Sequence, residues 1–564
     1  MNKLILIKIS IPILVLATDA FPQRLARADN MSQRYTSTIE WRDKEDVIFG
    51  WDWSLPHWVK PTDNSAMAFS HAPDGFQFPG NRLYVVSTSW RELEPIEGSY
   101  RFDLLQKKID QQLEKDPNAR VMLFIYGSLW KQHFKDSASK PGNVPDWLAE
   151  YPWFSTHLEN WQNVVPLFQL ENADIYEPEF NRRYMKFLGS LGRSGVLDHP
   201  KIGPVMIKGK SGSMGEEHGE PKQDSEDFPV WLERLDAWID MMGDDVHKLV
   251  TGTTNEPWAS IMTDRGIGTR SGFAEMYLLR MENQVLGQYI DKNGFLCVDE
   301  SVPMIAEERY NGDDNEEYIV GRHEMRFGPV EYWPHRHHES SLRILQMRRN
   351  FLIRYHVATH PNMASYVALE LGRNVENTPD IWCYLRKSYL GSSSKATPKA
   401  TRHYERWLYN RDVPGHSPVY SERIDLPKEK SGKPWSRNRH PDHYYDYTAR
   451  KTDLASGNPA ISFDIDDRWL SKGTESLQFK ITFTDRGNGT IQLQYVDSSG
   501  ELQSRSVKCA NTGSIRTATF NVSDLDPNDR LSIHSHKMDF RIQAVGEDVT
   551  VNFVRVIKSR LGDL

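Results

Sequence analysis

The hydrophobic pattern of this 564-residue chain changes character once, and this change constrains its fold more than any other feature. Between about residues 40 and 415, short apolar runs alternate with stretches of helical periodicity, as in βα units around a parallel sheet. From about residue 445 onward, only short alternating strands separated by turn residues remain, as in a β-sandwich. The pattern therefore predicts two units of different fold class, in that order along the chain.

Eight apolar runs in the first unit are candidate strands of the parallel sheet: residues 47–53, 82–89, 120–126, 202–209, 248–254, 295–299, 328–333 and 364–371. Helical periodicity separates most of them, at residues 102–113, 180–191, 228–242, 273–289 and 342–356. Eight strands with intervening helices predict an α/β fold, a (β/α)8 TIM barrel with long loops. The alternative is an open doubly wound sheet, but no G-x-G-x-x-G follows the first strand, which disfavours a dinucleotide-binding fold.

The predicted domain organisation adds two further segments to these units. Residues 1–28 have the features of a secretory signal peptide: a basic start, an apolar run at 9–16 that is too short to span a bilayer, and an A-x-A cleavage site. The barrel would then occupy residues 29–415, a linker or strap rich in Pro, Lys, Arg and Ser would follow at 416–444, and an accessory β-sandwich would form from 445–564. We expect a secreted or periplasmic protein without a membrane anchor.

The composition excludes several classes of function. The chain contains 17 Trp, 23 Tyr and 23 Phe, too many aromatic residues for a disordered protein, and its net charge of −8 provides no basic field for nucleic acid. The three cysteines have no metal-ligand spacing, so we expect neither a metal nor another cofactor. A surplus of aromatic side chains in a polar protein suits surfaces that stack on sugar rings.

Tryptophan recurs at the carboxyl ends of the expected strands, where a barrel places its working residues. The residues concerned are Trp51, Trp53, Trp90, Trp130, Trp258 and Trp333. A single such tryptophan is most often a packing residue, but several at one rim predict platforms for pyranose rings. We therefore expect the substrate-binding residues to be Trp53, Trp90, Arg91, Trp130, Glu256, Trp258, Trp333 and His335.

Glu216 is the first candidate catalytic residue. It follows the fourth expected strand in a glycine-flanked loop, near the cationic side chains Lys208, Lys210 and His218. A carboxyl group that is flanked by cations and partly desolvated by bound sugar can be tuned as a general acid/base. The adjacent Glu217 could take the same role, and a solvated loop acid without a catalytic role is the structural alternative.

Glu331 is the second candidate. It lies inside the apolar run 328–333, where an acidic side chain needs a partner, either a substrate or an arginine such as Arg326. With Glu216 as acid/base and Glu331 as nucleophile, the two carboxyls would face each other across the barrel mouth. A separation of about 5–5.5 Å would give retaining glycoside hydrolysis, and a larger one inversion.

Several segments resemble the clan A barrel glycosidases, especially the family 42 β-galactosidase-like enzymes. They read W-R-E-L-E-P-x-E-G-x-Y-x-F at residues 90–102, V-P-D-W-L at 144–148, and P-L-F at 166–168 with Y-x-P-x-F at 176–180. The resemblance covers roughly residues 45 to 375. It implies a retaining glycoside hydrolase with its acid/base after strand four, its nucleophile at strand seven, and Arg91 as a positioning residue near the nucleophile.

The chain departs from that family at the fourth strand, where clan A enzymes usually carry Asn-Glu. Here the corresponding pair is Gly215-Glu216, which is similar to a divergent branch of galactosidase-like barrels, whereas Asn255-Glu256 occurs one strand later. If the strands are miscounted, Glu256 becomes the acid/base. The cationic residues near the expected rim, including Lys131 and His335, are either scattered surface charge or donors for an anionic sugar, as in enzymes that act on sulfated algal galactans such as carrageenan.

Two other functions compete with a glycoside hydrolase acting on galactose-containing oligo- or polysaccharide. A non-catalytic carbohydrate-binding barrel would keep the tryptophan rim without a working carboxylate pair. A polysaccharide lyase would use a Tyr or His base on an acidic sugar and would release an unsaturated, ultraviolet-absorbing product. Hydrolysis of oligosaccharides without such absorbance separates the first function from both alternatives.

Overall fold

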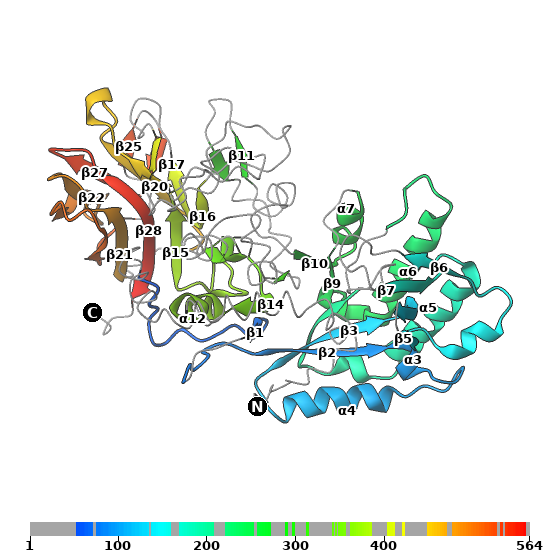
Figure 1. Ribbon diagram of the computed structural model, residues 1–564. Coiled ribbons are helices and arrows are strands. Elements are labelled where there is room, and N and C mark those ends of the chain that lie inside the picture. Colours follow the sequence, from blue (N-terminus) through cyan, green and yellow to red (C-terminus); the bar gives the residue numbers. More distant parts are fainter. Residues whose placement is uncertain are drawn as a thin grey trace.

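A computed structural model describes most of the chain. The described residues are 52–70, 75–134, 137–159, 168–207, 220–252, 257–271, 288–290, 296–298, 312–314, 341–342, 344–346, 348–356, 361–385, 403–411, 420–423, 448–470, 476–526, 531–533 and 536–559. Within them the protein is a mixed α/β structure with many strands and few helices (Figure 1). No helix among these residues is both long and apolar enough to cross a membrane.

The first unit contains an eight-stranded sheet in which every neighbouring pair of strands is parallel. Its strands are β1 (Ala66–Ser70), β2 (Leu83–Ser89), β3 (Arg120–Tyr126), β8 (Ile202–Met206), β9 (Leu249–Thr251), β10 (Gly268–Ser271), β13 (Gly312–Asp314) and β14 (Phe351–His356). From β2 to β14 they lie side by side in sequence order, and β1 pairs with β14. A parallel bridge between Met67 and Arg82, with a 2.9 Å hydrogen bond from Met67 N to the Asn81 carbonyl oxygen, also joins β1 to the start of β2.

Helices accompany part of this sheet. The described α-helices are α3 (Trp90–Leu93), α4 (Phe102–Leu113), α5 (Pro178–Gly192), α6 (Asp227–Met242), α7 (Trp258–Thr263) and α12 (Pro361–Glu370), and the 3-10 helices are η2 (Asp146–Glu150), η3 (Val196–Asp198), η4 (Gly243–Lys248) and η7 (Leu454–Ser456). Helix α5 begins with Pro178, and the Glu177 carboxylate accepts a 2.7 Å hydrogen bond from Phe180 N, which satisfies a free donor of the first turn. A small antiparallel sheet is inserted before α5, in the order β5 (Ser137–Pro141), β4 (Leu129–Phe134), β7 (Phe168–Ala173), β6 (Thr156–Glu159).

Two antiparallel sheets form the second unit. The seven-stranded sheet contains β15 (Asp380–Tyr384), β16 (Tyr404–Arg406), β18 (Tyr420–Arg423), β19 (Thr448–Lys451), β21 (Ser476–Thr484), β24 (Ile515–Val522) and β28 (Thr550–Ser559). The five-stranded sheet has the order β17 (Leu408–Arg411), β20 (Ala460–Ile465), β27 (Phe540–Val545), β22 (Thr490–Val496), β23 (Leu502–Lys508). Both sheets contribute to one hydrophobic core. In it the centroid of the Phe540 ring lies 5.0 Å from that of Phe463 and 4.9 Å from that of Phe479. Two separate hairpins pair β11 (Gln288–Ile290) with β12 (Leu296–Val298) and β25 (Leu531–Ile533) with β26 (His536–Met538).

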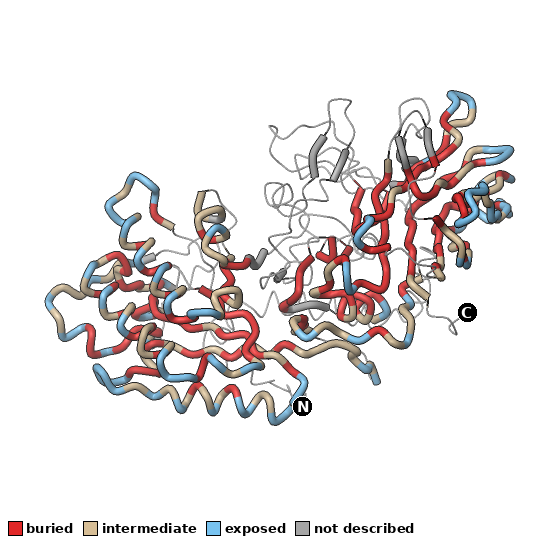
Figure 2. The backbone as a smooth tube through the Cα atoms, turned by 180° about the vertical axis from the view of Figure 1, so that it is seen from behind, coloured by how far each residue is buried: buried red, intermediate tan, exposed pale blue. Residues whose placement is uncertain are grey.

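The two units share a core at their junction. Trp53, from the segment before β1, packs against Tyr366 of α12 and Phe553 of β28, with ring centroids 5.2 and 5.6 Å apart. The strands β2 and β3 with α4 occupy one end of the molecule, and β22 and β27 the other (Figure 1). Buried residues run through the strands of both units, while exposed residues gather on α4 and on loops at the two ends (Figure 2).

Four of the eight predicted strands are confirmed, namely β2, β3, β8 and β9. The complete (β/α)8 barrel is not shown, because the segments that join β10, β13 and β14 lie mostly outside the described residues and few helices are described. The prediction of a strand at 364–371 is wrong, since α12 occupies it. Six of the ten residues of α12 are buried, and a short, largely buried apolar run does not reveal by its pattern whether it is a helix or a strand.

Other sequence-based assignments also need correction. Residues 52 and 53 are not in a strand, and β1 provides the first strand instead of 47–53; the remainder of that run lies outside the described residues. The predicted sixth strand, 295–299, contains β12, which pairs antiparallel with β11 and not with the parallel sheet. The predicted helix at 342–356 ends in β14.

The boundary between the two units also differs from the predicted one. The antiparallel unit begins at β15, near residue 380, and not after a linker at 416–444, because β15 to β18 pair within its two sheets. The 28-residue leader lies outside the described residues.

Candidate functional site

The carboxyl edge of the parallel sheet is the place where we expected catalysis. Counted in the sheet, β8 is the fourth strand and β9 the fifth, so the loop that contains Glu216 follows the fourth strand and Glu256 follows the fifth. The strand count of the sequence prediction thus agrees with the sheet at these two positions. The side chains of Glu216, Glu217, Glu256, Glu331, Trp333 and His335 lie outside the described residues.

The seventh strand differs from the prediction. It is β13, whose residue Asp313 is in register with Ser271 of β10 and Leu352 of β14, whereas the run 328–333 falls between β13 and β14. Asp313 and Asp314 thus occupy the edge position that we had assigned to Glu331. Sequence reasoning missed them because a three-residue polar strand carries no apolar run.

Trp90 and Trp53 are core residues and not sugar platforms. Trp90 is 0% exposed. Three aromatic rings of α5 surround its ring, with centroid-to-centroid distances of 5.4 Å for Phe180, 5.3 Å for Tyr184 and 5.7 Å for Phe187. Trp53 is 6% exposed in the junction core. The two rings are buried because α5 packs three aromatic rings against Trp90, and α12 packs Tyr366 against Trp53.

The other two described tryptophans differ from each other. Trp130 is 8% exposed, with the Phe154 ring 4.9 Å away edge-on and the Lys131 ammonium 5.1 Å from its centroid. Trp258 is only half-buried on α7, just beyond the carboxyl end of β9, and its indole N–H donates to the Pro221 carbonyl oxygen at 2.9 Å. Among the described tryptophans of the predicted rim, Trp258 therefore keeps the most accessible ring.

The motif at residues 90–102 has a structural role that sequence reasoning did not assign. The Glu94 carboxylate accepts hydrogen bonds from the Trp90 indole at 2.6 Å and from Gly98 N at 2.8 Å, and the Trp147 indole donates to the Glu94 carbonyl oxygen at 3.0 Å. Burial raises the pKa of Glu94. Arg91 forms an ion pair with Asp146 of η2. The motif thus fastens the loop after β2 to η2.

The inserted antiparallel sheet carries charged groups beyond the end of β3. His133 Nε2 lies 2.6 Å from the Glu171 carboxylate, which also accepts a 2.7 Å hydrogen bond from the Thr156 hydroxyl. Burial raises the pKa of Glu171, but the hydrogen bonds from Thr156 and His133 outweigh it, so the net direction is downward. Glu171 is therefore an ionised partner of His133. Within the described ranges, no three His, Cys, Asp or Glu side chains are grouped so that they could hold a metal ion.

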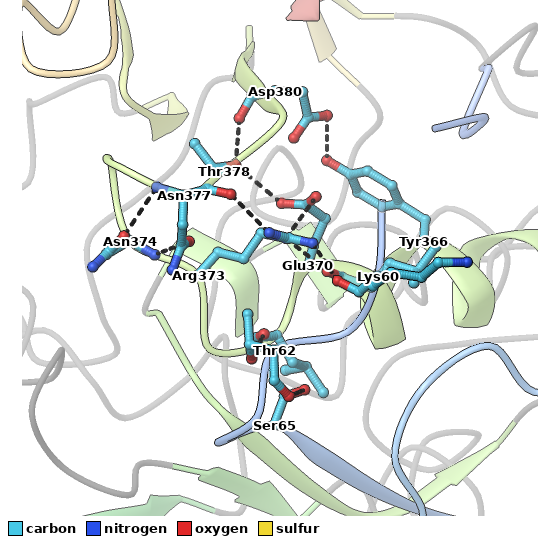
Figure 3. Close-up of polar contacts among 12 residues, drawn as sticks. Lys60, Thr62, Ser65, Tyr366, Glu370, Arg373, Asn374, Asn377, Thr378 and Asp380 are labelled. Atoms are coloured by element: carbon cyan, nitrogen blue, oxygen red, sulfur yellow. Dashed lines mark hydrogen bonds and ion pairs between the residues drawn. The ribbon is translucent and has the colours of Figure 1, made fainter. Parts of the chain in front are cut away.

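A second cluster of ionisable groups lies at the junction of the two units (Figure 3). Glu370, at the end of α12, forms an ion pair with Arg406 of β16 at 2.8 Å, and Asp380 of β15 pairs with Arg555 of β28 and accepts a 3.0 Å hydrogen bond from the Tyr366 hydroxyl. Burial, and then the charge of Asp380, raise the pKa of Glu370 to about 8. Glu370 and Asp380 are both 0% exposed, so these carboxyls join the units and have no access to substrate.

No protein-family model matches this chain, and a search of curated proteins gives no match either. The functional conclusion therefore depends on the residues and their arrangement.

Proposed function

We propose that the chain is a secreted, retaining glycoside hydrolase of the β-galactosidase-like kind, whose parallel sheet closes into a (β/α)8 barrel. The observation that carries the proposal is the sheet itself: eight parallel strands in sequence order, with β1 bonded both to β14 and to the start of β2. In a closed barrel the carboxyl ends of all strands converge on one mouth, where glycosidases of this architecture carry their carboxyl groups.

In this proposal Glu216 is the general acid/base. Glu216 follows β8 in the chain by ten residues, and cationic neighbours in sequence together with bound sugar would tune its pKa. Glu216 would protonate the leaving glycosidic oxygen and then deprotonate the attacking water. Glu217 is the neighbouring residue that must be distinguished from it.

The nucleophile is Glu331, which would attack the anomeric carbon as an ionised carboxylate and form a covalent glycosyl-enzyme. It lies in the segment that connects β13 to β14. Asp313 and Asp314 compete for this role, because they occupy the end of the seventh strand. Asp-to-Asn and Glu-to-Gln substitutions remove the charge with little change in size, so they can separate these candidates.

The substrate in this proposal is a galactose-containing oligo- or polysaccharide that carries sulfate groups. Trp258 offers a partly exposed ring beside the carboxyl end of β9, and Lys131 is an exposed cation on β4, just beyond β3. An indole stacks on the apolar face of a pyranose, and an ammonium group attracts sulfate. The signal peptide would bring the enzyme to polymers outside the cell.

A glycan screen with chromatographic product analysis tests the proposal. The mature chain should release oligosaccharides from sulfated or neutral galactans without new ultraviolet absorbance. E216Q should lower the rate about 10²–10⁴-fold on natural substrates, whereas E217Q should leave it within a few-fold. Azide should rescue E331G with an inverted product. Rescue of D313G or D314G instead would move the nucleophile to β13, and absence of hydrolysis with retained binding would favour a non-catalytic carbohydrate-binding protein.

A further inference from the structure

The five-stranded sheet of the second unit has one face directed away from the shared core. Along β22 and β27, the buried residues Ile491, Leu493 and Ile542 belong to that core. Because side chains alternate along a strand, the residues between them lie on the opposite face. These half-buried or exposed residues, with their partners on β23, form what we call the outer polar face: Gln492, Gln494, Ser504, Ser506, Arg541 and Gln543.

Strand register arranges the outer polar face in two rows across three strands. In one row Arg541 is opposite Gln494, which is opposite Ser504. In the other row Gln543 is opposite Gln492, which is opposite Ser506. These six residues therefore provide amide, hydroxyl and guanidinium groups at the regular spacing of a sheet, and the carboxylate of Asp464 on the neighbouring strand β20 is paired with Arg411.

A chain of hydrogen bonds holds these groups in place. Arg541 Nε donates to the Gln494 side-chain oxygen at 2.7 Å, the Gln494 amide donates to the Gln492 side-chain oxygen at 2.6 Å, and the Gln492 amide reaches the Ser506 hydroxyl at 3.3 Å. Side chains that are already ordered lose less conformational entropy when a ligand binds. The chain thus presents pre-oriented polar groups.

Arg541 is the charged member of this face, and its charge is not balanced. Arg411, in the same sheet, forms an ion pair with Asp464, but Arg541 forms no ion pair with any residue that the structure describes; its side-chain hydrogen bond goes to the neutral Gln494. Partial burial lowers the pKa of Arg541. A partly desolvated guanidinium with unused N–H donors is a favourable position for an anion.

We propose that the outer polar face binds an anionic polysaccharide, with the Arg541 guanidinium on a sulfate or carboxylate group and the glutamine amides on sugar hydroxyls. The face lies at the end of the molecule opposite β2 and β3 (Figure 1), so it is separate from the carboxyl edge of the parallel sheet. It would hold the polymer while another segment is hydrolysed. The inference rests on the proposed function only for the class of ligand.

Affinity electrophoresis of the full-length chain tests the proposal, with carrageenan in the gel as the sulfated polymer and agarose as the unsulfated comparison. The background variant carries E216Q so that the polymer is not consumed. In this background R541Q should weaken binding to carrageenan about tenfold, the loss expected for one charge-assisted hydrogen-bonded contact. R541K should lose part of that affinity, because an ammonium group lacks the fork of the guanidinium.

Arg505 provides the matched control, because it is an exposed arginine on β23 whose register partner, Leu493, belongs to the core-facing set. R505Q should leave binding within twofold. Equal losses in R541Q and R505Q, equal retardation by agarose, or no retardation of the starting chain by either polymer would each overturn the proposal. In a protein that keeps Glu216, R541Q should not change the hydrolysis of a small soluble substrate. If this hydrolysis is absent while carrageenan still binds through Arg541, the proposed enzyme function is wrong and the proposed binding face is supported.

Discussion

The two units of the molecule differ in how deeply several of their ion-paired carboxyl groups are buried. In the antiparallel unit Asp380, Asp466 and Asp485 are each 0% exposed on their side chains and are held by arginines. In the parallel-sheet unit the described Glu97 and Asp146 side chains are 42% and 66% exposed and lie on loops or short helices. The three acids of the antiparallel unit therefore pair in the interior, whereas Glu97 and Asp146 pair with Arg183 and Arg91 at the surface.

The largest expected effect comes from breaking a buried pair at the junction. Arg555 is buried, pairs with Asp380 and donates a 2.8 Å hydrogen bond to the Asp52 carbonyl oxygen. R555M would leave the Asp380 charge uncompensated and should lower the free energy of unfolding by about 3–5 kcal/mol, measured by urea unfolding followed by tryptophan fluorescence.

The partly exposed Arg516, which pairs with Asp485 at 3.2 Å, is the control for this prediction. R516Q should change stability by less than about 1 kcal/mol, because the guanidinium is partly exposed and the buried Asp485 carboxylate keeps its hydrogen bonds from Ala510 N and the Thr512 hydroxyl. A loss in R555M as small as that in R516Q would mean that the antiparallel unit does not depend on the buried pair of Arg555 and Asp380, and the contrast between interior and surface ion pairs would disappear.

Trp90 tests whether the aromatic residues of the parallel-sheet unit are packing residues or platforms. W90A should lower the free energy of unfolding by about 3–5 kcal/mol, because the cavity would lie among the rings of α5. W258A removes a half-buried ring that packs against the same core and donates to the Pro221 carbonyl oxygen, so it should cost less stability than W90A, and it should raise the KM for oligosaccharide. A stable W90A variant with weakened substrate binding would instead indicate that Trp90 is a substrate-binding residue.

Gly127, just after β3, tests how tightly α5 packs on the parallel sheet. A Cβ atom at this position would lie 2.6 Å from Cε2 of the buried Tyr184 ring, so G127A should lower the free energy of unfolding by about 1–3 kcal/mol through overpacking. In G189A, within α5, the new methyl group would meet only the flexible end of Arg193 at 3.3 Å. That variant should gain about 0.5–1 kcal/mol from helix propensity, and a loss instead would show that both glycines are sterically required.

The pH dependence of the junction tests the buried carboxyl groups in a different way. Glu370 faces Asp380, Arg406, Arg373 and Arg555, and its pKa is raised from 4.5 to about 8. Between these two pH values the folded protein keeps a proton that the unfolded chain has released, so the contribution of Glu370 to stability is full below about pH 4.5 and is lost as pH rises through about 8. The E370Q variant should show a flatter decline of the urea midpoint from pH 5 to 8 than the unsubstituted protein; an unchanged slope would assign the decline to other groups.

The parts of the fold that were predictable are those with a regular local period. Helix α4 matches the predicted residues 102–113, and β3 matches 120–126, because each element buries one face or both against neighbours and so repeats its apolar residues regularly. Strands β10 and β13 were not predictable. They have four and three residues, and neither contains an apolar run.

The site was predictable to a lesser degree. The position of Glu216 after the fourth strand follows from strand order, which the structure confirms up to β9. Burial of Trp90 did not follow from its position at a strand end, because that burial depends on rings from α5, which begins 88 residues later in the chain.

The sequence by itself determined the succession of an α/β unit and an all-β unit, because apolar periodicity is a local property of each element. Only the tertiary structure decided where the boundary lies, which acids are structural and which tryptophans are core. Those properties depend on contacts between distant segments: Asp380 meets Arg555, and Trp53 meets Phe553. Whether a charge or ring is buried depends on its partner, and a partner far away along the chain does not affect the local sequence pattern.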